Sequence, residues 1–339
     1  MASELEGTPI SHTDSALPRL VGTGDPMQVR IVRVERESTT VISIEVARED
    51  GTALPAWTPG AHVDAVLPSG RVRQYSLCGD PDDLAVYKFA VLREDTGRGG
   101  SVELHTIAAA GVSLGIRPPR NRFPFLDAPR YLFFAGGIGV TPLLPMARAA
   151  ARQDRRFMFV YGGRTRATMA FTAELGALQG GAVRIVPQDE FGHPLFDPLL
   201  RASPPETLVY ACGPAGMLRE AQAAAERNGA AARLRIERFS AAEAAPLSRR
   251  DCAFDVVLNR SGRTVHVPAG RTLGSVLQEH GAEVTFSCEE GSCGTCETRV
   301  LGGVPDHRDS YFSDDERACS RSMMVCVGRS LSAKLVLDA

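Results

Sequence analysis

The sequence predicts a multidomain protein in which an antiparallel β-barrel is followed by a doubly wound α/β domain and then by a small α+β domain. Three observations carry this expectation. Short alternating strands fill the first third of the chain, apolar strands alternate with helical segments in the middle third, and four cysteines gather near the C-terminus. A length of 339 residues suits two or three such domains.

Composition excludes several classes of function. The formal net charge of −2 gives no general attraction for nucleic acid or for a membrane surface. No apolar stretch follows a basic start, and the longest apolar run, Tyr131 to Val140, is too short to span a bilayer. We therefore expect a cytoplasmic monomer without nucleic-acid or membrane partners.

The barrel is expected over residues 27–128, after a flexible N-terminal segment, residues 1–26, that is rich in small and polar residues. β-branched and polar residues alternate along each expected strand, and Gly/Pro turns separate the strands. Six such strands within about 100 residues are typical of a closed antiparallel barrel. The expected strands are 29–34, 39–46, 61–67, 72–77, 86–92 and 112–117.

Two motifs in the barrel indicate a flavin phosphate site. Arg73 and Tyr75 share one face of a strand and offer a cation for a phosphate and an aromatic ring for a planar ligand, while Ser76 can hydrogen-bond a ring nitrogen. The run Arg98-Gly99-Gly100-Ser101 opens an expected helix over 101–110, so its free N–H groups and dipole favour an anion.

The α/β domain is expected over residues 129–239. A buried strand at 131–135 precedes a glycine-rich turn and an apolar helix, and the strand–helix alternation then repeats, as in βαβ units. The other expected elements are strands at 156–161, 182–186, 207–211 and 233–239, with helices at 170–178 and 215–228.

Two strand ends in this domain are candidate nucleotide sites, because ligands of open α/β sheets collect at the carboxyl ends of the strands. Arg164, after the next strand, could contact the adenosine ribose or a 2′-phosphate, and Cys212 is small enough to stand beside a nicotinamide ring. The candidates in the two turns are Gly136, Gly137, Gly139, Thr141 and Pro142, and then Cys212, Gly213 and Pro214.

A linker at 240–250 separates this domain from the last one, residues 251–339, in which Cys288, Cys293, Cys296 and Cys326 follow C-x4-C-x2-C…C spacing. That spacing is typical of the ligands of a plant-type [2Fe–2S] cluster, so a ferredoxin-like (β-grasp) fold is expected. Small residues between the cysteines, among them Gly291 and Gly294, let the loop wrap around a cluster.

Three other interpretations of the cysteines remain open. A disulfide pair or a zinc knuckle would use the same residue type, although a cytosolic setting and the absence of paired zinc motifs disfavour both. Cys319 is a rival to Cys326 as fourth ligand.

Taken in order, these motifs resemble the phthalate dioxygenase reductase family, and in particular the reductase subunits of vanillate demethylases, over residues 27–339. Further motifs that carry the resemblance are Pro119-Arg-Asn-Arg-Phe-Pro, Glu237-Arg-Phe239 and Asp306-His-Arg-Asp-Ser.

The resemblance implies FMN and NADH as cofactors beside the [2Fe–2S] cluster. It also implies that Phe239 lies near the isoalloxazine and that Thr141 reaches toward the flavin. The FMN ligands that it implies are Arg73, Tyr75, Ser76, Ala90, Val91, Leu92, Gly99, Gly100, Ser101 and Thr141.

The expected function is that of an NADH-dependent reductase that feeds a Rieske-type oxygenase. Hydride carries two electrons whereas an iron–sulfur cluster takes one, and a flavin mediates between them. Ser76, Cys212 and Phe239 are the expected ring-positioning residues. An iron–sulfur sensor or binding protein with a vestigial nucleotide domain is the alternative.

Overall fold

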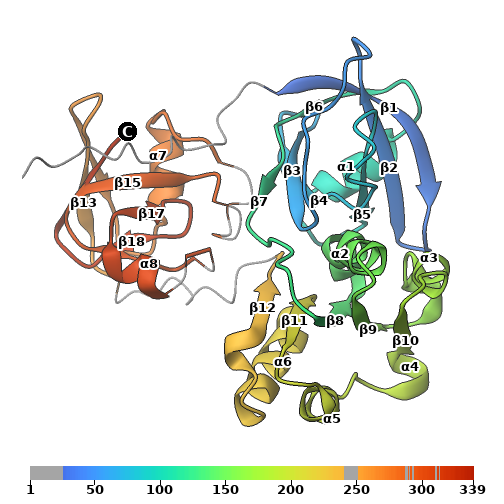
Figure 1. The fold of residues 1–339 in the computed structure, drawn as a ribbon. Helices are drawn as coiled ribbons and strands as arrows, with labels where there is room; N and C mark the ends of the chain where they lie inside the picture. Colours follow the sequence, from blue (N-terminus) through green and yellow to red (C-terminus); the bar gives the residue numbers. More distant parts are fainter. Residues whose placement is uncertain are drawn as a thin grey trace, which may run out of the picture.

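The computed structural model describes residues 26–239, 251–286, 289, 291, 294–309, 311, 312 and 314–339. It contains the three kinds of module that the sequence predicts, coloured from blue through green to red in Figure 1. The N-terminal segment, apart from Pro26, and the linker at 240–250 lie outside the described residues. No helix in the described part of the chain has the length and apolar character needed to cross a membrane.

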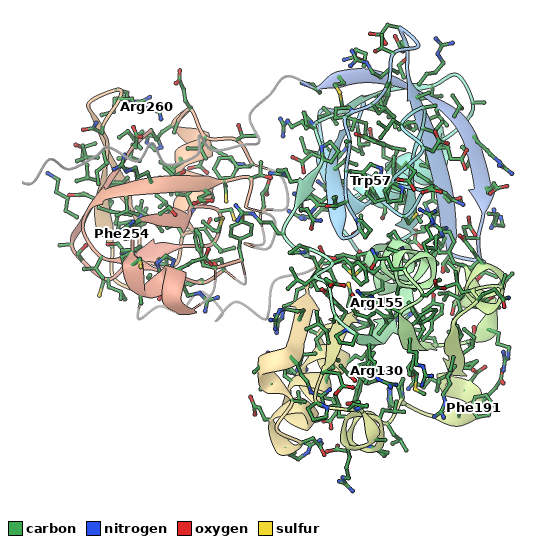
Figure 2. The ribbon with its side chains drawn as sticks, viewed as in Figure 1. Trp57, Arg130, Arg155, Phe191, Phe254 and Arg260 are labelled. Atoms are coloured by element: carbon green, nitrogen blue, oxygen red, sulfur yellow. The ribbon has the colours of Figure 1, made fainter. Side chains whose placement is uncertain are left out.

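The first module is an antiparallel sheet in the order β4-β3-β6-β1-β2-β5, with β7 added on β3. A single bridge between Leu77 and Phe89 joins the end of β4 to β5 and closes the sheet into a barrel. Trp57, the only tryptophan of the chain, is buried inside it (Figure 2). The strands are β1 (Met27–Arg36), β2 (Val41–Arg48), β3 (Ala61–Val66), β4 (Val72–Ser76), β5 (Tyr87–Leu92), β6 (Ser113–Ile116) and β7 (Arg120–Asn121), with helix α1 (Gly100–Ile107).

The second module is a parallel sheet in the order β10-β9-β8-β11-β12. The chain winds outward from β8 in one direction and then returns to β11, so the topological switch lies between these two strands. Its strands are β8 (Arg130–Gly136), β9 (Arg156–Gly163), β10 (Gly181–Pro187), β11 (Thr207–Cys212) and β12 (Leu234–Glu237). Its helices are α2 (Val140–Arg152), α3 (Thr172–Gly176), α4 (Gln188–Phe191), α5 (Phe196–Ala202) and α6 (Ala215–Arg227), with 3₁₀ turns η1 (Gly137–Gly139), η2 (Arg166–Thr168) and η3 (Ala231–Arg233).

The helix expected at 170–178 is shorter in the structure. Phe171 has a left-handed φ of 59°, a conformation that a helix cannot include, so α3 begins only after it. Helix α5 has no counterpart among the sequence expectations, because Pro198 lies inside its short run and masks the periodic pattern.

The third module is a mixed sheet in the order β14-β13-β19-β15-β17, packed on helix α7. The hydroxyl of Thr272 accepts the N–H of Ser275 and caps α7. The elements are β13 (Phe254–Leu258), β14 (Arg263–Val267), α7 (Leu273–Glu279), β15 (Glu297–Gly302), β16 (Pro305–Asp306), α8 (Asp314–Cys319), β17 (Ser322–Met324), β18 (Arg329–Ser330) and β19 (Lys334–Leu337). The module lies beside the barrel, on the side of β7 (Figure 1).

Candidate functional site

The expected phosphate site forms where β4 meets α1. Gly99 begins the helix with a left-handed φ of 80°, and a Cβ on Gly100 would lie 2.5 Å from Nε of Arg73. The Arg73 side chain therefore lies directly over the helix N-terminus, and its Nη2 donates to the Arg98 carbonyl at 3.0 Å. Ser101 is held nearby, since its Oγ accepts the N–H of Glu94.

Positive charge accumulates at this site. Burial, and then the neighbouring charge of Arg98, lowers the pKa of Arg73. Arg71 adds a further positive charge to the site and is paired with Glu103 at 3.1 Å. A phosphate dianion at the α1 N-terminus would compensate these charges, so the residues fit a flavin phosphate.

The residues implied to hold the flavin ring lie along β4 and β5. Ser76 is buried, and the Tyr75 ring stacks on Phe89 at 5.2 Å. Strand β5 pairs along its length with β2 alone, so beyond the Leu77–Phe89 bridge the other edge of Ala90 to Leu92 has no strand neighbour in the described sheet. The Val91 carbonyl lies 2.9 Å from Nε2 of His105. A planar ligand with polar ring edges suits such an edge.

The two glycine-containing turns expected to bind nucleotide meet at the switch point. A Cβ on Gly139 would lie 2.2 Å from the carbonyl oxygen of Cys212, so only glycine allows this approach. Gly137 has a left-handed φ of 52°, and a Cβ there would meet open space. The turn is therefore packed on one side and open on the other, as a turn that receives a pyrophosphate must be.

The expected flavin residues of β5 lie close to the nucleotide turn that precedes α2. Ala90 of β5 and Val140 at the start of α2 belong to one buried cluster that joins the barrel to the parallel sheet. Thr141 is buried there, and its hydroxyl donates to the Ile138 carbonyl at 2.9 Å. Arg164 is exposed beyond β9, and Phe239, at the last described position before the linker, is 41% exposed.

A half-buried acid, Glu237, lies next to Cys212, and sequence reasoning gave it no role. Glu237 is the register partner of Cys212 across β11 and β12, and the Cys212 sulfur lies 3.9 Å from its Oε2. Burial raises the pKa of Glu237 to about 8, and burial raises the pKa of the Cys212 thiol well above its ordinary value. The signal in the sequence was a lone acid at the end of an expected strand.

Two of the four expected cluster ligands are described. Cys296 and Cys326 are both buried. Cys296 directly precedes β15 and Cys326 follows β17, and the pairing of Glu297 with Met324 brings these two strand ends together. Cys288 and Cys293 lie outside the described residues. Cys319, the rival ligand, is exposed at the end of α8.

The loop that carries the expected ligands 288, 293 and 296 is tightly packed at its two described glycines. A Cβ on Gly291 would lie 2.9 Å from Cα of Asp309, and a Cβ on Gly294 would lie 2.3 Å from the Tyr311 ring. Both glycines have left-handed φ values of 71° and 77°. Small residues with this backbone and buried thiols are what a loop around a [2Fe–2S] cluster needs, so these residues fit the cluster.

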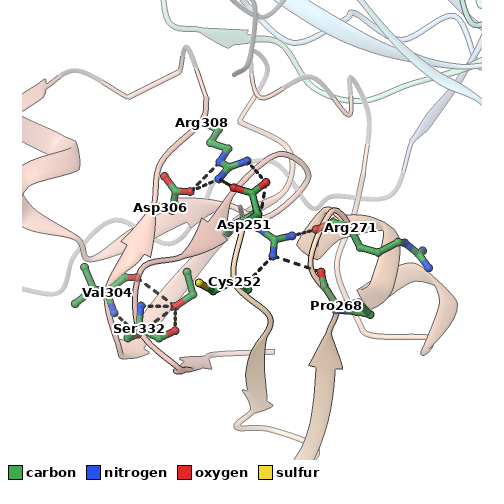
Figure 3. Close-up of polar contacts among 10 residues, drawn as sticks. Asp251, Cys252, Pro268, Arg271, Val304, Asp306, Arg308 and Ser332 are labelled. Atoms are coloured by element: carbon green, nitrogen blue, oxygen red, sulfur yellow. Dashed lines mark hydrogen bonds and ion pairs between the residues drawn. The ribbon is translucent and has the colours of Figure 1, made fainter. Parts of the chain in front are cut away.

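A network of ion pairs fixes the third module where the chain re-enters it after the linker (Figure 3). Arg308 binds Asp251 at 2.8 Å and Asp306 at 2.6 Å. The fully buried Arg329 donates to the carbonyl of Cys252 at 2.8 Å. The motif around Asp306 therefore holds the start of the module.

A barrel with an anion site, a nucleotide turn at a sheet switch and a module with buried cluster thiols together define a flavin- and iron–sulfur-dependent oxidoreductase of pyridine nucleotides. Profiles of two families match the chain: the oxidoreductase NAD-binding domain over residues 133–223 and the 2Fe-2S iron-sulfur cluster binding domain over residues 256–329.

Whole-chain relatives extend these matches. The chain is 39% identical to phenoxybenzoate dioxygenase subunit beta of Ectopseudomonas oleovorans, over 92% of this chain and 97% of the relative. It is 38% identical to vanillate O-demethylase oxidoreductase of Pseudomonas sp., over 92% of this chain and 99% of the relative. The solved structure of phthalate dioxygenase reductase superposes with a TM-score of 0.69 at 34% identity, covering 93% of this chain and 98% of that one.

The chain belongs to the phthalate dioxygenase reductase family, which includes the reductase components of oxygenase systems. It is an oxidoreductase with FMN, NADH and a [2Fe–2S] cluster as cofactors. The resemblance and the three-module fold expected from the sequence are confirmed.

Proposed function

We propose that this protein takes hydride from NADH and delivers single electrons to a Rieske-type oxygenase. The observation that carries the proposal is that three groups of expected site residues lie close together: those on β5, the Gly139 turn and the Cys212 turn. When bound, FMN accepts hydride and the cluster accepts electrons singly, which matches a two-electron donor to a one-electron acceptor.

The residues of the chain have positioning roles in this proposal. Arg73, with the N-terminus of α1, binds the FMN phosphate, and Tyr75 and Ser76 of β4 hold the isoalloxazine ring. The buried Cys212 forms the wall beside the nicotinamide, and Phe239 covers the ring from the start of the linker. These groups fix ring geometry, and no acid–base residue is needed for hydride transfer itself.

The remaining ligand assignments follow the same logic. Val91 and its neighbours offer backbone groups to the flavin, the glycines of the first nucleotide turn bind the pyrophosphate, and four cysteines hold the cluster. The sets are Ala90, Val91, Leu92, Gly99, Gly100, Ser101 and Thr141 for FMN; Gly136, Gly137, Gly139, Thr141, Pro142, Arg164, Gly213 and Pro214 for NADH; and Cys288, Cys293, Cys296 and Cys326 for the cluster.

NADH rather than NADPH is supported by a carboxylate at the expected ribose end. Arg166 is held by Glu190 through two hydrogen bonds of 2.7 and 2.9 Å, which leaves less of its charge for a 2′-phosphate. Asp189 adds a second negative charge there.

The partner and setting are proposed from the relatives. Reductases named for different oxygenases share this architecture, so the partner oxygenase selects the substrate. We propose a monomer in the cytoplasm, to be checked by sedimentation and by cell fractionation.

Arg73→Met tests the assignment directly. Loss of the phosphate cation should weaken FMN binding by at least about tenfold, since charge-assisted hydrogen bonds are the strong ones. Fluorescence titration of the flavin-free protein with FMN measures this, and Arg93→Met, on an exposed arginine of the same module, is the control. Equal FMN affinity in the two variants would contradict the assignment.

A second measurement separates a reductase from the iron–sulfur sensor that the sequence left open. NADH should bleach the flavin of the loaded protein and support continuous reduction of a one-electron acceptor. A protein that binds its cofactors yet does neither would be the sensor.

A further inference from the structure

The motif Pro119-Arg-Asn-Arg-Phe-Pro has no role in the site described above. Its residues Arg120 and Asn121 form β7, which pairs with β3 on the side of the barrel that faces the third module (Figure 1). Asn121 fixes this segment, because its amide donates to Thr58 and Pro59 and its oxygen accepts the N–H of Phe123.

Arg120 is anchored by a carboxylate inside the barrel. Asp64 of β3 has a fully buried side chain whose Oδ1 accepts from Arg120 Nη2 at 2.6 Å and from Gln74 Nε2 at 2.8 Å. Arg117 lies 3.5 Å from its other oxygen. Gln74 stands between Arg73 and Tyr75 on β4, so Asp64 links Arg120 to the strand assigned to the flavin.

The same Arg120 nitrogen reaches out of the barrel to the cluster loop. Its Nη2 lies 3.4 Å from Oγ1 of Thr295, the residue that precedes Cys296. The Arg120 side chain is only 14% exposed, so this contact lies between the two modules and is shielded from solvent. One guanidinium nitrogen thus joins a carboxylate of the barrel to the loop of the third module.

Arg122 makes a second contact with the third module. Its guanidinium carbon lies 5.0 Å from the centre of the Tyr311 ring. This ring also packs closely on Gly294, where a Cβ would lie 2.3 Å from the ring. Of the two arginines, spaced i and i+2 on one segment, Arg120 therefore reaches Thr295 directly and Arg122 reaches the neighbouring Gly294 through Tyr311.

A third contact lies at the edge of the same interface. Arg98 and Glu289 approach to 3.8 Å, and their side chains are 41% and 51% exposed. An exposed pair at this distance adds little energy. The specific part of the interface is therefore the Arg120 and Arg122 pair.

We propose that Arg120 and Arg122 are positioning residues that seat the cluster loop on the flavin barrel, with Asp64 as the anchor of Arg120. Gln74, Asp64, Arg120 and Thr295 form a continuous polar link from the flavin strand to the cluster loop. The inference rests on the proposed function, because the link matters only if electrons pass between these two sites. Small misplacement of reacting groups is costly in such sites.

Arg120→Lys tests the proposal with a matched control. The lysine keeps a cation for Asp64, so the barrel stays folded, but its single ammonium on a shorter stem loses the reach to Thr295. Arg117→Lys is the control, because Arg117 faces the same carboxylate but forms no hydrogen bond or ion pair with a described residue of the third module. The experiment uses the fully loaded protein.

Two readouts are needed. In Arg120→Lys, amide hydrogen exchange in the peptide over 294–302 should become faster by about tenfold, as expected for loss of one charge-assisted contact. In stopped flow, bleaching of the flavin by NADH should keep its rate while reduction of the cluster slows by about tenfold. Arg117→Lys should change neither.

A second pair of variants guards against a folding defect. Arg122→Met and Tyr311→Leu each remove the cation–π contact without touching Asp64, and both should slow cluster reduction by about threefold, with a double variant no slower than either. If Arg120→Lys and Arg122→Met match the unaltered protein in both readouts, the positioning role is wrong. If the unaltered protein itself shows no flavin bleaching, the proposed function fails instead.

Discussion

Two acids with low exposure, the buried Asp64 in the barrel and the half-buried Glu237 in the parallel sheet, have opposite surroundings. Asp64 is enclosed by Arg117, Arg120 and Gln74, whereas the side chain that hydrogen-bonds Glu237 among the described residues is the thiol of Cys212. Surroundings decide what each acid does: cations hold the Asp64 carboxylate as an anchor, whereas burial raises the pKa of Glu237 and leaves it close to neutral.

This difference has a functional meaning. A paired carboxylate is suited to hold arginines in place and, through Arg120, a neighbouring module. A carboxyl with its pKa raised to about 8 adds no full negative charge at neutral pH to the place where nicotinamide is expected. In the proposal above, Asp64 connects the barrel to the third module, whereas Glu237 stands without a full charge beside the expected nicotinamide site.

The largest expected effect comes from removing the anchor. Asp64→Ala leaves two arginines without their buried partner and should lower the free energy of unfolding of the barrel by about 3–5 kcal/mol. Fluorescence of Trp57, the single tryptophan and buried in this barrel, reports the transition in urea. Asp95→Asn, on an exposed acid of the same module, should leave the midpoint where it is. Equal midpoints for the two variants would refute the anchor.

The next effect is a pH dependence that belongs to Glu237. Its pKa is raised from 4.5 to about 8, so the folded state holds a proton that the unfolded state releases between these values. The stabilisation is complete below about pH 4.5 and is lost as pH rises through 8, with a slope approaching about 1 kcal/mol per pH unit. Glu237→Gln, neutral at every pH, should remove this slope.

Amide exchange of the β12 peptide between pH 5 and 8, corrected for intrinsic exchange, measures the local stability in both proteins. Glu226→Gln, in helix α6 of the same module, is the control because its carboxyl is exposed. A slope that persists in Glu237→Gln would assign the pH dependence to another group.

The sequence could predict the modules and the motifs but not the two acids. Gly139 lies just after β8 and Cys212 ends the neighbouring parallel strand β11, so the rule that ligands collect at strand ends placed both at one edge of the sheet. In the strand that holds Asp64, this single acid was the available signal. Its partner Arg120 is 56 residues away, and Thr295 is a further 175 residues from Arg120. Only tertiary packing determines such pairs, and no local pattern encodes them.

The smallest effect concerns an exposed acid, Glu190, which contrasts with Asp64 and Glu237. Its hydrogen-bonded ion pair with Arg166 raises the pKa of that arginine, but both side chains are exposed, so Glu190→Gln should leave stability unchanged. The variant should instead free Arg166 for a 2′-phosphate and lower the KM for NADPH by about three- to tenfold, with the KM for NADH nearly constant.

Initial rates of flavin-dependent acceptor reduction with each nucleotide measure this preference. Glu220→Gln, which loosens a comparable exposed pair with Arg227 in the same module, is the control and should change neither KM. An unchanged KM for NADPH in Glu190→Gln would mean that Arg166 does not face the ribose, and the basis for preferring NADH would then have to lie elsewhere at the carboxyl edge of the sheet.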